Sequence, residues 1–488
     1  MPRTAHRVAL PFAVTPPGTS GDGPLRHRIA DAVIAAVGAG TLRPGDALPS
    51  TRTLATDLGV SRGAVVAAYD ELTAAGFIVS RPGSGTVVAP GADRAAVAGA
   101  ASHVPAVGEM ARVRAAAVAP SPRWDLRPGR PDTGLLDPTA WRRAWRAAAE
   151  HVPGNDAGAG PPHTTLRAAL ADHLRRSRGV ALDPDDILIA PGVGASLHAL
   201  PSALGLVGQV VALEDPGYVE AWSAFERSGV AVRAVPVDED GLDPARLQHD
   251  DRAVYVTPSH QYPLGGRMPV TRRVELLTWA RDAGGLVIED DYDGEFRYDV
   301  SPLPALRSLP GAANHVVYVG TASKLVAPSL RISWLVPPRE LRDRLRTELE
   351  VRGLVVNEPS GLALAEFITS GALGTHHARA SRTYAARRAA LVSALSRHLP
   401  DLRVVGVDAG LHVVLRLPAQ VDDLALVSRL EQAGVAVSPL SAYAVTVAAS
   451  GLVLCYAGLP AGQSAEAVAA LADVLLTCSR QGSGWAAG

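Results

Sequence analysis

Apolar residues at helical spacing dominate the first part of the chain. The segment LRHRIADAVIAAVGAG, residues 25–40, predicts a helix that ends in glycine. Two more helices are expected, one from about residue 50 to Gly59 and one capped by Ser61 and ending at Gly76. FIVSRPGSGTVVA then predicts two strands around a tight Pro-Gly turn. Together these elements predict a helix-turn-helix followed by a wing, in which the second helix would enter a DNA major groove.

Polar donors occupy the positions where such a module meets DNA. They lie at the helix starts and at the wing tip, and they are Arg52, Ser61, Arg62 and Arg81. A helix N-terminus with a serine cap favours phosphate oxygens, because its backbone N–H groups are unpaired. The pattern by itself leaves a second interpretation open, a small helical protein-interaction domain with scattered surface arginines.

The pattern changes from Trp124 onward, where β-type runs alternate with helical segments. The runs are ILIA, VVALED, VRAVPV, AVYVTP, LVIEDD and HVVYVG. Such alternation predicts an α/β domain with a mostly parallel sheet covered by helices. Beyond about residue 375, an arginine-rich helix and the strands LHVVLRL and LVLCYA predict a smaller C-terminal α+β subdomain.

The domain bounds follow from these patterns. Residues 21–89 form the predicted DNA-binding domain, and residues 124–488 the second domain. Between them, residues 90–123 are rich in Ala, Pro, Gly and Val, which predicts a linker, although an Ala-rich helix is compatible with this composition.

Composition narrows the class of protein. The 488 residues are 47% hydrophobic and 19% charged, with a net charge of −1, which is typical of a soluble globular protein. No apolar run of about 18 residues occurs, and the proline-broken N-terminus does not resemble a signal peptide. Cys455 and Cys478 lack metal-ligand spacing and fit buried thiols in a reducing compartment. A cytoplasmic protein is expected.

One lysine stands out. Of the 47 lysine and arginine residues, only Lys324 is a lysine. Arginine can replace lysine where a charge is enough, but it cannot lose its proton and attack a carbonyl. Lys324 follows the strand HVVYVG, with the hydroxyls of Thr321 and Ser323 beside it and Arg331 available for a phosphate. A solvated surface lysine is the alternative, but these neighbours favour a Schiff base with pyridoxal 5'-phosphate (PLP).

Other strand ends supply the remaining groups that PLP needs. LVIEDDYDGEFRY ends a strand in acids, and ligands bind at such ends in α/β sheets. Asp290 is the candidate partner of the ring nitrogen, and Tyr292 supplies a hydroxyl near the ring oxygen. Solvated loop acids or a metal site are the alternatives, and no histidine cluster in the sequence supports a metal. The backbone of Gly192, Val193 and Gly194 is a candidate phosphate cradle, and Tyr218 a pocket residue.

Longer motifs connect both halves to a known family. LRPGDALPSTRTLATDLGVSRGAVVAAYDELTAAGFIVSRPGSGTVVA resembles the winged helix of GntR-type regulators. VALEDPGY, VYVTPSHQYPLG, VIEDDYDGEFRY and VYVGTASKLVAPSLRISWLV resemble the fold-type I, class I aminotransferase domain of MocR-type regulators. The resemblance covers about residues 21–89 and 124–480, and the order of the blocks matches as well.

The resemblance implies roles for individual residues. It implies that Lys324 forms the Schiff base, that Asp290 pairs with the pyridine nitrogen and that Tyr292 approaches the phenolic oxygen. It also implies that Tyr218 lines the cofactor pocket and that Arg331 contacts the phosphate.

The chain departs from the family where a substrate carboxylate would bind. The Tyr-Gly-Asp-Pro type of segment, which a partner chain contributes, is replaced by AGAGPPHTTLR, and the phosphate turn lacks the usual glutamines. Two arginine positions of transaminases or of GABA-sensing members hold Val453 and Glu220. A carboxylate without such arginines loses charge-assisted bonds worth about 1.5–3 kcal/mol each. Arg382 and His412 are alternative clamps.

Three functions remain at this stage. The leading one is a PLP-dependent regulator, most similar to the PdxR-like branch, that acts as a homodimer on a DNA operator. It senses PLP or an amine or amino acid without turnover, and it controls PLP supply. The second is a working aminotransferase with an accessory N-terminal domain. The third is a cofactor-free dimerisation scaffold, which has no use for the lone lysine.

Overall fold

The computed structural model describes residues 24–81, 85–101, 122–152, 154, 161–298 and 304–480. The chain divides into two compact units, Met1–Pro120 and Ser121–Gly488. Among the described residues no helix is both long and apolar enough to cross a membrane.

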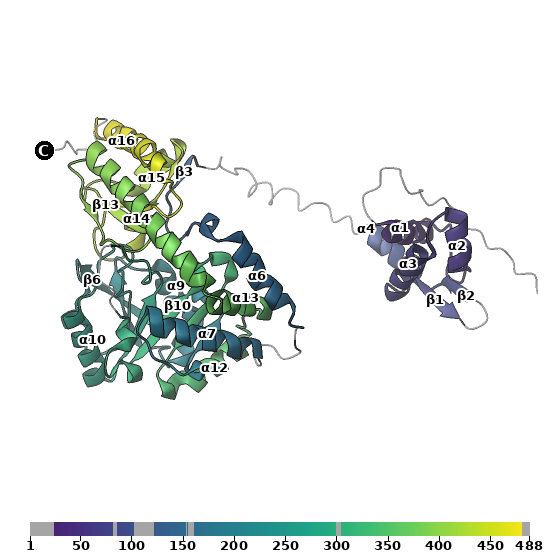
Figure 1. The fold of residues 1–488 in the computed structure, drawn as a ribbon, viewed down its shortest axis with the longest axis horizontal. Helices are drawn as coiled ribbons and strands as arrows, with labels where there is room; N and C mark the ends of the chain where they lie inside the picture. Colours follow the sequence, from purple (N-terminus) through teal and green to yellow (C-terminus); the bar gives the residue numbers. More distant parts are fainter. Residues whose placement is uncertain are drawn as a thin grey trace, which may run out of the picture. The chain divides into compact units, whose positions relative to one another are not determined.

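The first unit contains the predicted helix-turn-helix and wing (Figure 1). Its elements are α1 (Leu25–Gly38), α2 (Thr51–Leu58), α3 (Arg62–Ala74), β1 (Ile78–Arg81), β2 (Gly85–Val88) and α4 (Ala92–Ala101). Serine caps start two of the helices, because Ser50 Oγ accepts from Thr53 N at 3.1 Å and Ser61 Oγ accepts from Ala64 N at 3.3 Å. Gly59 ends α2 in the left-handed region, at φ 64°. β1 and β2 pair antiparallel, as expected of a wing.

The core of this unit is small and aliphatic. Ile29 and Val33 of α1 pack with Val65 and Leu72 of α3 in one buried cluster. Helix α4 lies in the first part of the stretch predicted as a linker. It contacts α1 and buries Ala92 and Ala96 in the same core. The rest of that stretch, residues 102–121, lies outside the described residues.

An eight-stranded sheet forms the centre of the second unit. Its order is β4 (Leu188–Ala190), β11 (Ser333–Val336), β10 (Val316–Thr321), β9 (Leu286–Asp291), β8 (Asp251–Val256), β5 (Val210–Asp215), β6 (Ala231–Asp238) and β7 (Gly241–Leu242). The five strands from β10 to β6 run parallel, whereas β11 and β7 are antiparallel to their neighbours. The carboxyl ends of the parallel strands therefore meet at one edge, where the predicted site residues follow them.

Helices cover both faces of this sheet (Figure 1). They are α6 (Pro138–Ala149), α7 (Pro161–Ser177), α8 (Val193–Ala203), α9 (Val219–Arg227), α10 (Val270–Ala283), α11 (Ala322–Leu325), α12 (Arg342–Val351) and α13 (Glu358–Thr369). Neighbouring residues of β9 face opposite layers, as the pleat of a strand requires. Ile288 packs in the cluster that contains Leu197 of α8 and Phe225 of α9, while Val287 packs with Leu276 of α10.

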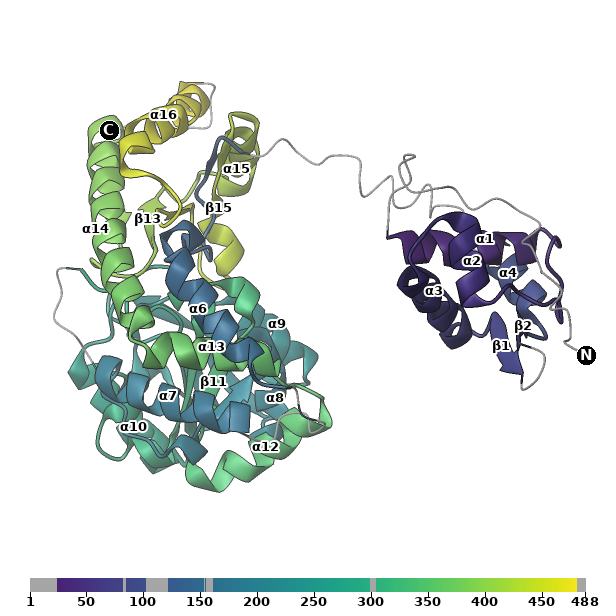
Figure 2. The same ribbon diagram turned by 45° about the vertical axis from the view of Figure 1, so that its right-hand side comes forward.

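The predicted α+β subdomain closes the unit. Its antiparallel sheet has the order β12 (Val404–Val405), β13 (His412–Arg416), β16 (Gly451–Cys455) and β15 (Ser438–Pro439). Its helices are α14 (Ala372–His398), α15 (Asp423–Gln432) and α16 (Ser464–Arg480), and Figure 2 shows α14 and α16 beside β13. A short parallel pair, β14 (Val435–Ala436) with β3 (Trp124–Asp125), joins the start of the unit to this subdomain.

Candidate cofactor-binding site

A cavity of about 470 Å³ lies at the carboxyl edge of the parallel strands. It contains almost the whole predicted cofactor set, namely Lys324, Asp290, Tyr292, Arg331, Tyr218, Thr321, Val193 and Gly194. Segments from β3, β15 and their loops complete its wall, with Arg127, Pro128, Gly129, Arg130, Ser438 and Tyr443. The cavity therefore forms where the sheet and the small subdomain meet within one unit.

Lys324 presents its amine to this cavity from α11, directly after β10. Its Nζ donates to the backbone oxygen of Gly129 at 3.1 Å. Burial lowers the pKa of the amine, and the nearby carboxylates of Asp293 and Asp290 partly oppose this shift. A lowered pKa leaves more of the amine unprotonated, which is the form that attacks an aldehyde. Gly129 has φ 94°, and a side chain there would lie 3.6 Å from Nζ.

Asp290 has one oxygen paired and one unpaired. The hydroxyl of Tyr255 donates to its Oδ2, while Oδ1 is buried without a hydrogen-bond partner among the described residues. Burial raises the pKa of this carboxyl to about 7, although the Tyr255 hydrogen bond opposes the shift. A buried acceptor without a partner costs about 1–3 kcal/mol. The oxygen therefore fits a ligand that brings a charged N–H group, as a pyridinium does.

The acids on either side of Asp290 are used differently. Glu289 accepts from the backbone nitrogens of Leu306 and Arg307 at 2.7 and 2.8 Å. Asp291 accepts from Arg178 Nε at 2.6 Å and from the hydroxyl of Tyr318 at 2.8 Å. Both belong to the opposite face of β9 and lie outside the cavity lining. The three consecutive acids thus do not converge on one metal ion, and the interpretation as solvated loop acids is wrong because all three are buried.

Aromatic side chains form one wall of the cavity. The ring of Tyr262 lies edge-on to those of Tyr218, Tyr292 and Tyr443, with centroids 5.8, 5.6 and 5.3 Å away. Tyr443 reaches the cavity because its loop is tied to the sheet. Its backbone oxygen accepts from Gly217 N at 2.9 Å, and the following residues Val445 and Thr446 donate to Asp215.

The opposite end of the cavity suits an anion. Val193 and Gly194 open α8, whose N-terminal backbone N–H groups favour negative charge. Gly192 is not part of the lining, but it has φ 92°, and a Cβ there would lie 3.0 Å from Arg331 Cζ. The guanidinium of Arg331 therefore rests where only glycine leaves room. Thr321 Oγ1 accepts from Ser323 N at 3.0 Å and fixes the start of α11.

The alternative carboxylate clamps lie elsewhere. Arg382 is exposed on α14, and His412 is buried with its Nε2 2.8 Å from the backbone oxygen of Pro263. Neither lines the cavity. Val453 is buried in an aliphatic cluster with Val414 and Leu440.

Two arginines that the sequence interpretation missed do line the cavity. Arg127 holds Asp125 through Nε at 2.8 Å and through NH2 at 2.7 Å, and Arg130 NH1 donates to the same carboxylate at 2.8 Å. Asp125 thereby neutralises part of their charge. Glu220 is the exposed acid of the lining.

The predicted DNA contacts lie at the ends of elements in the first unit. Arg52 is exposed in the first turn of α2, and Ser61 and Arg62 are exposed at the start of α3. Arg81 ends β1, and its side chain lies outside the described part of the chain. The three described side chains thus mark the two helix starts of the helix-turn-helix.

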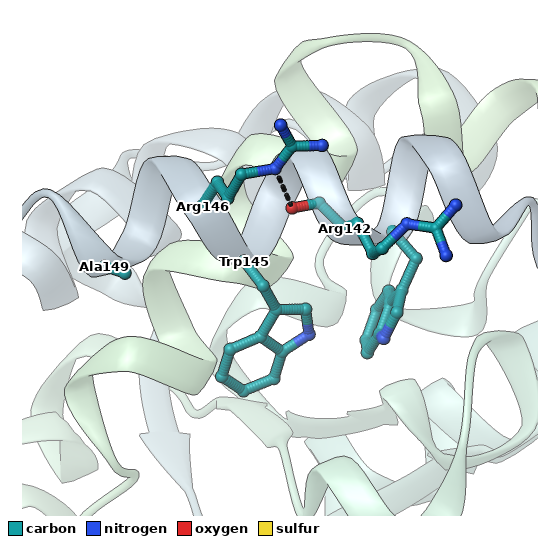
Figure 3. Close-up of a pocket in the computed structure, with 5 residues that line it drawn as sticks. Arg142, Trp145, Arg146 and Ala149 are labelled. Atoms are coloured by element: carbon teal, nitrogen blue, oxygen red, sulfur yellow. Dashed lines mark hydrogen bonds between the residues drawn. The ribbon is translucent and has the colours of Figure 1, made fainter.

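A second hollow, on the surface of α6, is of a different kind (Figure 3). Its volume is about 550 Å³, and it is lined by Trp141, Arg142, Trp145, Arg146 and Ala149. The two indoles pack edge to face, 5.8 Å apart. Among the described residues of its lining, the titratable side chains are two exposed arginines, so these residues offer no buried charge to fix a ligand.

Two family profiles match the chain. The profile "Aminotransferase class I and II" matches residues 125–471, and "Bacterial regulatory proteins, gntR family" matches residues 25–88. The chain is 36% identical over 434 residues to the HTH-type pyridoxine biosynthesis transcriptional regulator PdxR of Corynebacterium glutamicum, which covers 89% of this chain and 91% of that protein. It is 32% identical over 475 residues to the probable rhizopine catabolism regulatory protein MocR of Rhizobium meliloti, covering 95% and 96%.

A solved structure shares the fold of the second unit. An archaeal alanine:glyoxylate aminotransferase superposes with a TM-score of 0.68 at 25% identity, over 72% of this chain and 91% of that one. The predicted fold class, a winged helix-turn-helix joined to a fold-type I aminotransferase domain, is confirmed.

Proposed function

Because this chain belongs to the MocR-type transcriptional regulators, with a gntR family domain joined to a class I and II aminotransferase domain, we propose that it is a PLP-dependent DNA-binding regulator. One observation supports the proposal that the chain binds PLP. The amine of Lys324 and the unpaired, buried oxygen of Asp290 line the same cavity. In this proposal residues 21–89 bind DNA and residues 124–488 bind the effector, and α4 of the predicted linker packs with the DNA-binding unit.

In this proposal each residue of the cavity has one task. PLP, when bound, supplies an aldehyde carbon and a ring that accepts electrons. Lys324 provides the attacking amine, and Asp290 Oδ1 accepts from the ring nitrogen. Tyr292 would donate to the ring oxygen, and Tyr218 packs in the aromatic wall. The phosphate would be held by Arg331, Thr321 and the backbone N–H groups of Val193 and Gly194, whereas the predicted contact from Gly192 is not favoured because its N–H donates to the backbone oxygen of Ala190 at 2.8 Å.

The effector is PLP itself or an amine or amino acid that reacts with it. The absence of arginine at positions 453 and 220 disfavours an ordinary amino-acid substrate, because the arginines that do line the cavity, Arg127 and Arg130, already share the carboxylate of Asp125. This favours PLP as the signal and control of PLP supply as the output. A relative that is named for pyridoxine biosynthesis regulation supports the same assignment.

DNA binding is assigned to the winged unit of a homodimer. An effector changes transcription only if it binds two conformations of the regulator with different affinity. Closure of the small subdomain over the cavity, through the Tyr443 loop, supplies such a difference. Two winged units would then be repositioned on paired half-sites.

A second function is a working aminotransferase, which the fold of the solved relative favours. Repeated turnover of an amino donor by the purified full chain supports it. Conversion of bound PLP without turnover supports the regulator.

Operator binding by the full chain tests the proposal. DNA from the region upstream of its own gene is titrated with the wild type and with Arg62→Ala, each with and without PLP. Arg62→Ala is expected to weaken binding by about 1–3 kcal/mol if the side chain contacts a base. Arg94→Ala, an exposed arginine of α4, is the matched control and should bind as the wild type does. Equal binding by all three proteins on every fragment, or no response to PLP, contradicts the proposal.

A further inference from the structure

Three side chains form a hydrogen-bonded row under the cavity. Tyr292 and Asp293 follow β9, and His260 follows β8. His260 Nδ1 lies 3.0 Å from Asp293 Oδ2, 3.2 Å from Asp293 Oδ1 and 2.9 Å from the hydroxyl oxygen of Tyr292. Tyr292 lines the cavity, while His260 and Asp293 are buried behind it. One ring nitrogen thus faces both a carboxylate and a phenol.

The surroundings decide which nitrogen of His260 carries a proton. A bare Nδ1 lone pair would repel the two carboxylate oxygens, so Nδ1 carries a hydrogen in the neutral ring as well as in the charged one. Nε2 is buried and has no hydrogen-bond partner among the described residues, so a proton there would remain unpaired.

Two glycines hold the ring in this place. A Cβ on Gly410 would lie 2.1 Å from His260 Cε1 and 2.6 Å from Asp293 Oδ2, and a Cβ on Gly265 would lie 3.1 Å from His260 Nε2. Gly410 has φ 70° and Gly265 has φ 75°, so both positions favour glycine for the backbone as well. The backbone of two separate loops therefore closes around the pair.

This arrangement fixes the direction of the Tyr292 hydroxyl. Because Nδ1 donates, the phenol oxygen can only accept from it, and the phenol hydrogen must point elsewhere. We propose that Asp293, acting through His260, holds Tyr292 as a hydrogen-bond donor toward the cavity, and thereby lowers the proton affinity of the Lys324–cofactor linkage. The inference rests on the proposed function, since it concerns PLP bound at Lys324.

The physical reason is charge. A donor to the phenolic oxygen of PLP stabilises the negative charge on that oxygen. That charge is least compensated when the nitrogen joining Lys324 to PLP has lost its proton. The donor therefore favours the deprotonated linkage, and its loss raises the pH at which the linkage deprotonates. His260 and Asp293 are positioning residues in this scheme, and only Tyr292 touches the cofactor.

A metal ion is a poorer occupant of the same cluster. His260, Asp293 and His412 offer ligand atoms within 4.8 Å of one another. His412 Nε2 lies 2.8 Å from the backbone oxygen of Pro263, which only accepts, so this nitrogen carries a proton and only Nδ1 of His412 could bind a metal. Both oxygens of Asp293 face His260 Nδ1, at 3.2 and 3.0 Å, so this carboxylate is hydrogen-bonded to the imidazole, which disfavours an ion in the same place. Burial lowers the pKa of His412 to about 4, which keeps its ring neutral beside His260.

The other titratable groups that face Tyr292, His260 or Lys324 are unchanged in every variant of His260, Asp293 and Tyr292. They are Asp290, Tyr262, Glu214, Glu220, Cys455 and His412. Any difference between the variants therefore comes from the row itself.

The test is the pH midpoint of the near-visible absorbance band of the PLP-loaded full chain. His260→Gln moves its amide toward the Nε2 position and removes the donor at Nδ1, so the midpoint should rise by about one pH unit, a tenfold change in proton affinity. His260→Asn keeps a donor near the Nδ1 position and should titrate close to the wild type. In the Tyr292→Phe background, His260→Gln should have no further effect.

Asp293→Asn gives an independent measurement. The Asp293 carboxylate near Lys324 favours a protonated nitrogen, so its removal lowers the pH midpoint. In the Tyr292→Phe background this electrostatic lowering should be the whole effect of Asp293→Asn. With Tyr292 present, the loss of the donor opposes this lowering, so the shift that Asp293→Asn causes should be about one pH unit more positive than the shift that it causes in the Tyr292→Phe background.

The outcomes separate the inference from the proposed function. A wild-type chain that never shows the band contradicts PLP binding itself. A normal band with His260→Gln titrating like the wild type overturns the positioning role, and so does a shift of equal size in the Tyr292→Phe background.

Discussion

The two faces of strand β9 carry the same kind of side chain under opposite conditions. On the face toward α10, Glu289 and Asp291 have hydrogen-bond donors for their oxygens, including the guanidinium of Arg178. On the cavity face, Asp290 has one donor, and its other oxygen has no partner in the part of the chain that the structure describes. The two acids on the α10 face are hydrogen-bonded within the fold, and these bonds contribute to its stability. Asp290 is instead the acid that is available to a ligand.

The largest expected effect comes from the satisfied face. Asp291→Ala removes the carboxylate that pairs with the buried guanidinium of Arg178, and breaking a buried ion pair of this kind costs about 3–5 kcal/mol. Denaturant unfolding of the cofactor-free full chain measures this loss. A change below about 1 kcal/mol would mean that Asp291 is not the structural acid of the pair.

The cavity face predicts the reverse pattern. Asp290→Asn keeps the shape of the side chain and removes a buried charge, so the free energy of unfolding without PLP should change by less than about 1 kcal/mol or increase. PLP affinity should fall by about 1.5–3 kcal/mol, because the charged hydrogen bond to the ring nitrogen is lost. Equilibrium dialysis against PLP gives the affinity. If Asp290→Asn bound PLP as tightly as the wild type, Asp290 would not be the partner of the ring nitrogen.

A smaller effect is the dependence of stability on pH. Burial raises the pKa of Asp290 to about 7 in the folded chain, well above about 4 in an unfolded one. The folded state thus binds the extra proton between these values, and stability without PLP should fall as the pH rises from about 4 to 7. Glu214 and Glu289 also have pKa values raised to about 7 by burial, so only the difference from Asp290→Asn isolates Asp290. Parallel pH profiles for the two proteins would contradict the shift.

This comparison also shows what the sequence could predict. The run LVIEDD identified a strand with acids at its carboxyl end, and parallel topology then placed these acids near Lys324. Because successive side chains of a strand point to opposite faces of a sheet, the sequence also predicts that Asp290 faces the other way from Glu289 and Asp291.

The partners of these residues could not be predicted, because they are distant in the sequence. Tyr255 lies 35 residues before Asp290, and Gly129 lies 195 residues before Lys324. Tyr443 arrives on a loop of the small subdomain that Asp215 holds in place. The one local signal was the turn RPGR, in which Gly129 takes a positive φ. The winged unit was simpler to predict, because its caps and glycines are local signals.

The lone lysine allows the most direct test of the central claim, that PLP is held through Lys324. Borohydride reduces a lysine–PLP linkage to a stable secondary amine, and intact-mass measurement then counts the adducts on each chain. The wild type should carry one phosphopyridoxyl group, which peptide mapping places on Lys324, and Lys324→Ala should carry none. An unmodified wild-type chain, or equal modification of Lys324→Ala, would contradict the claim.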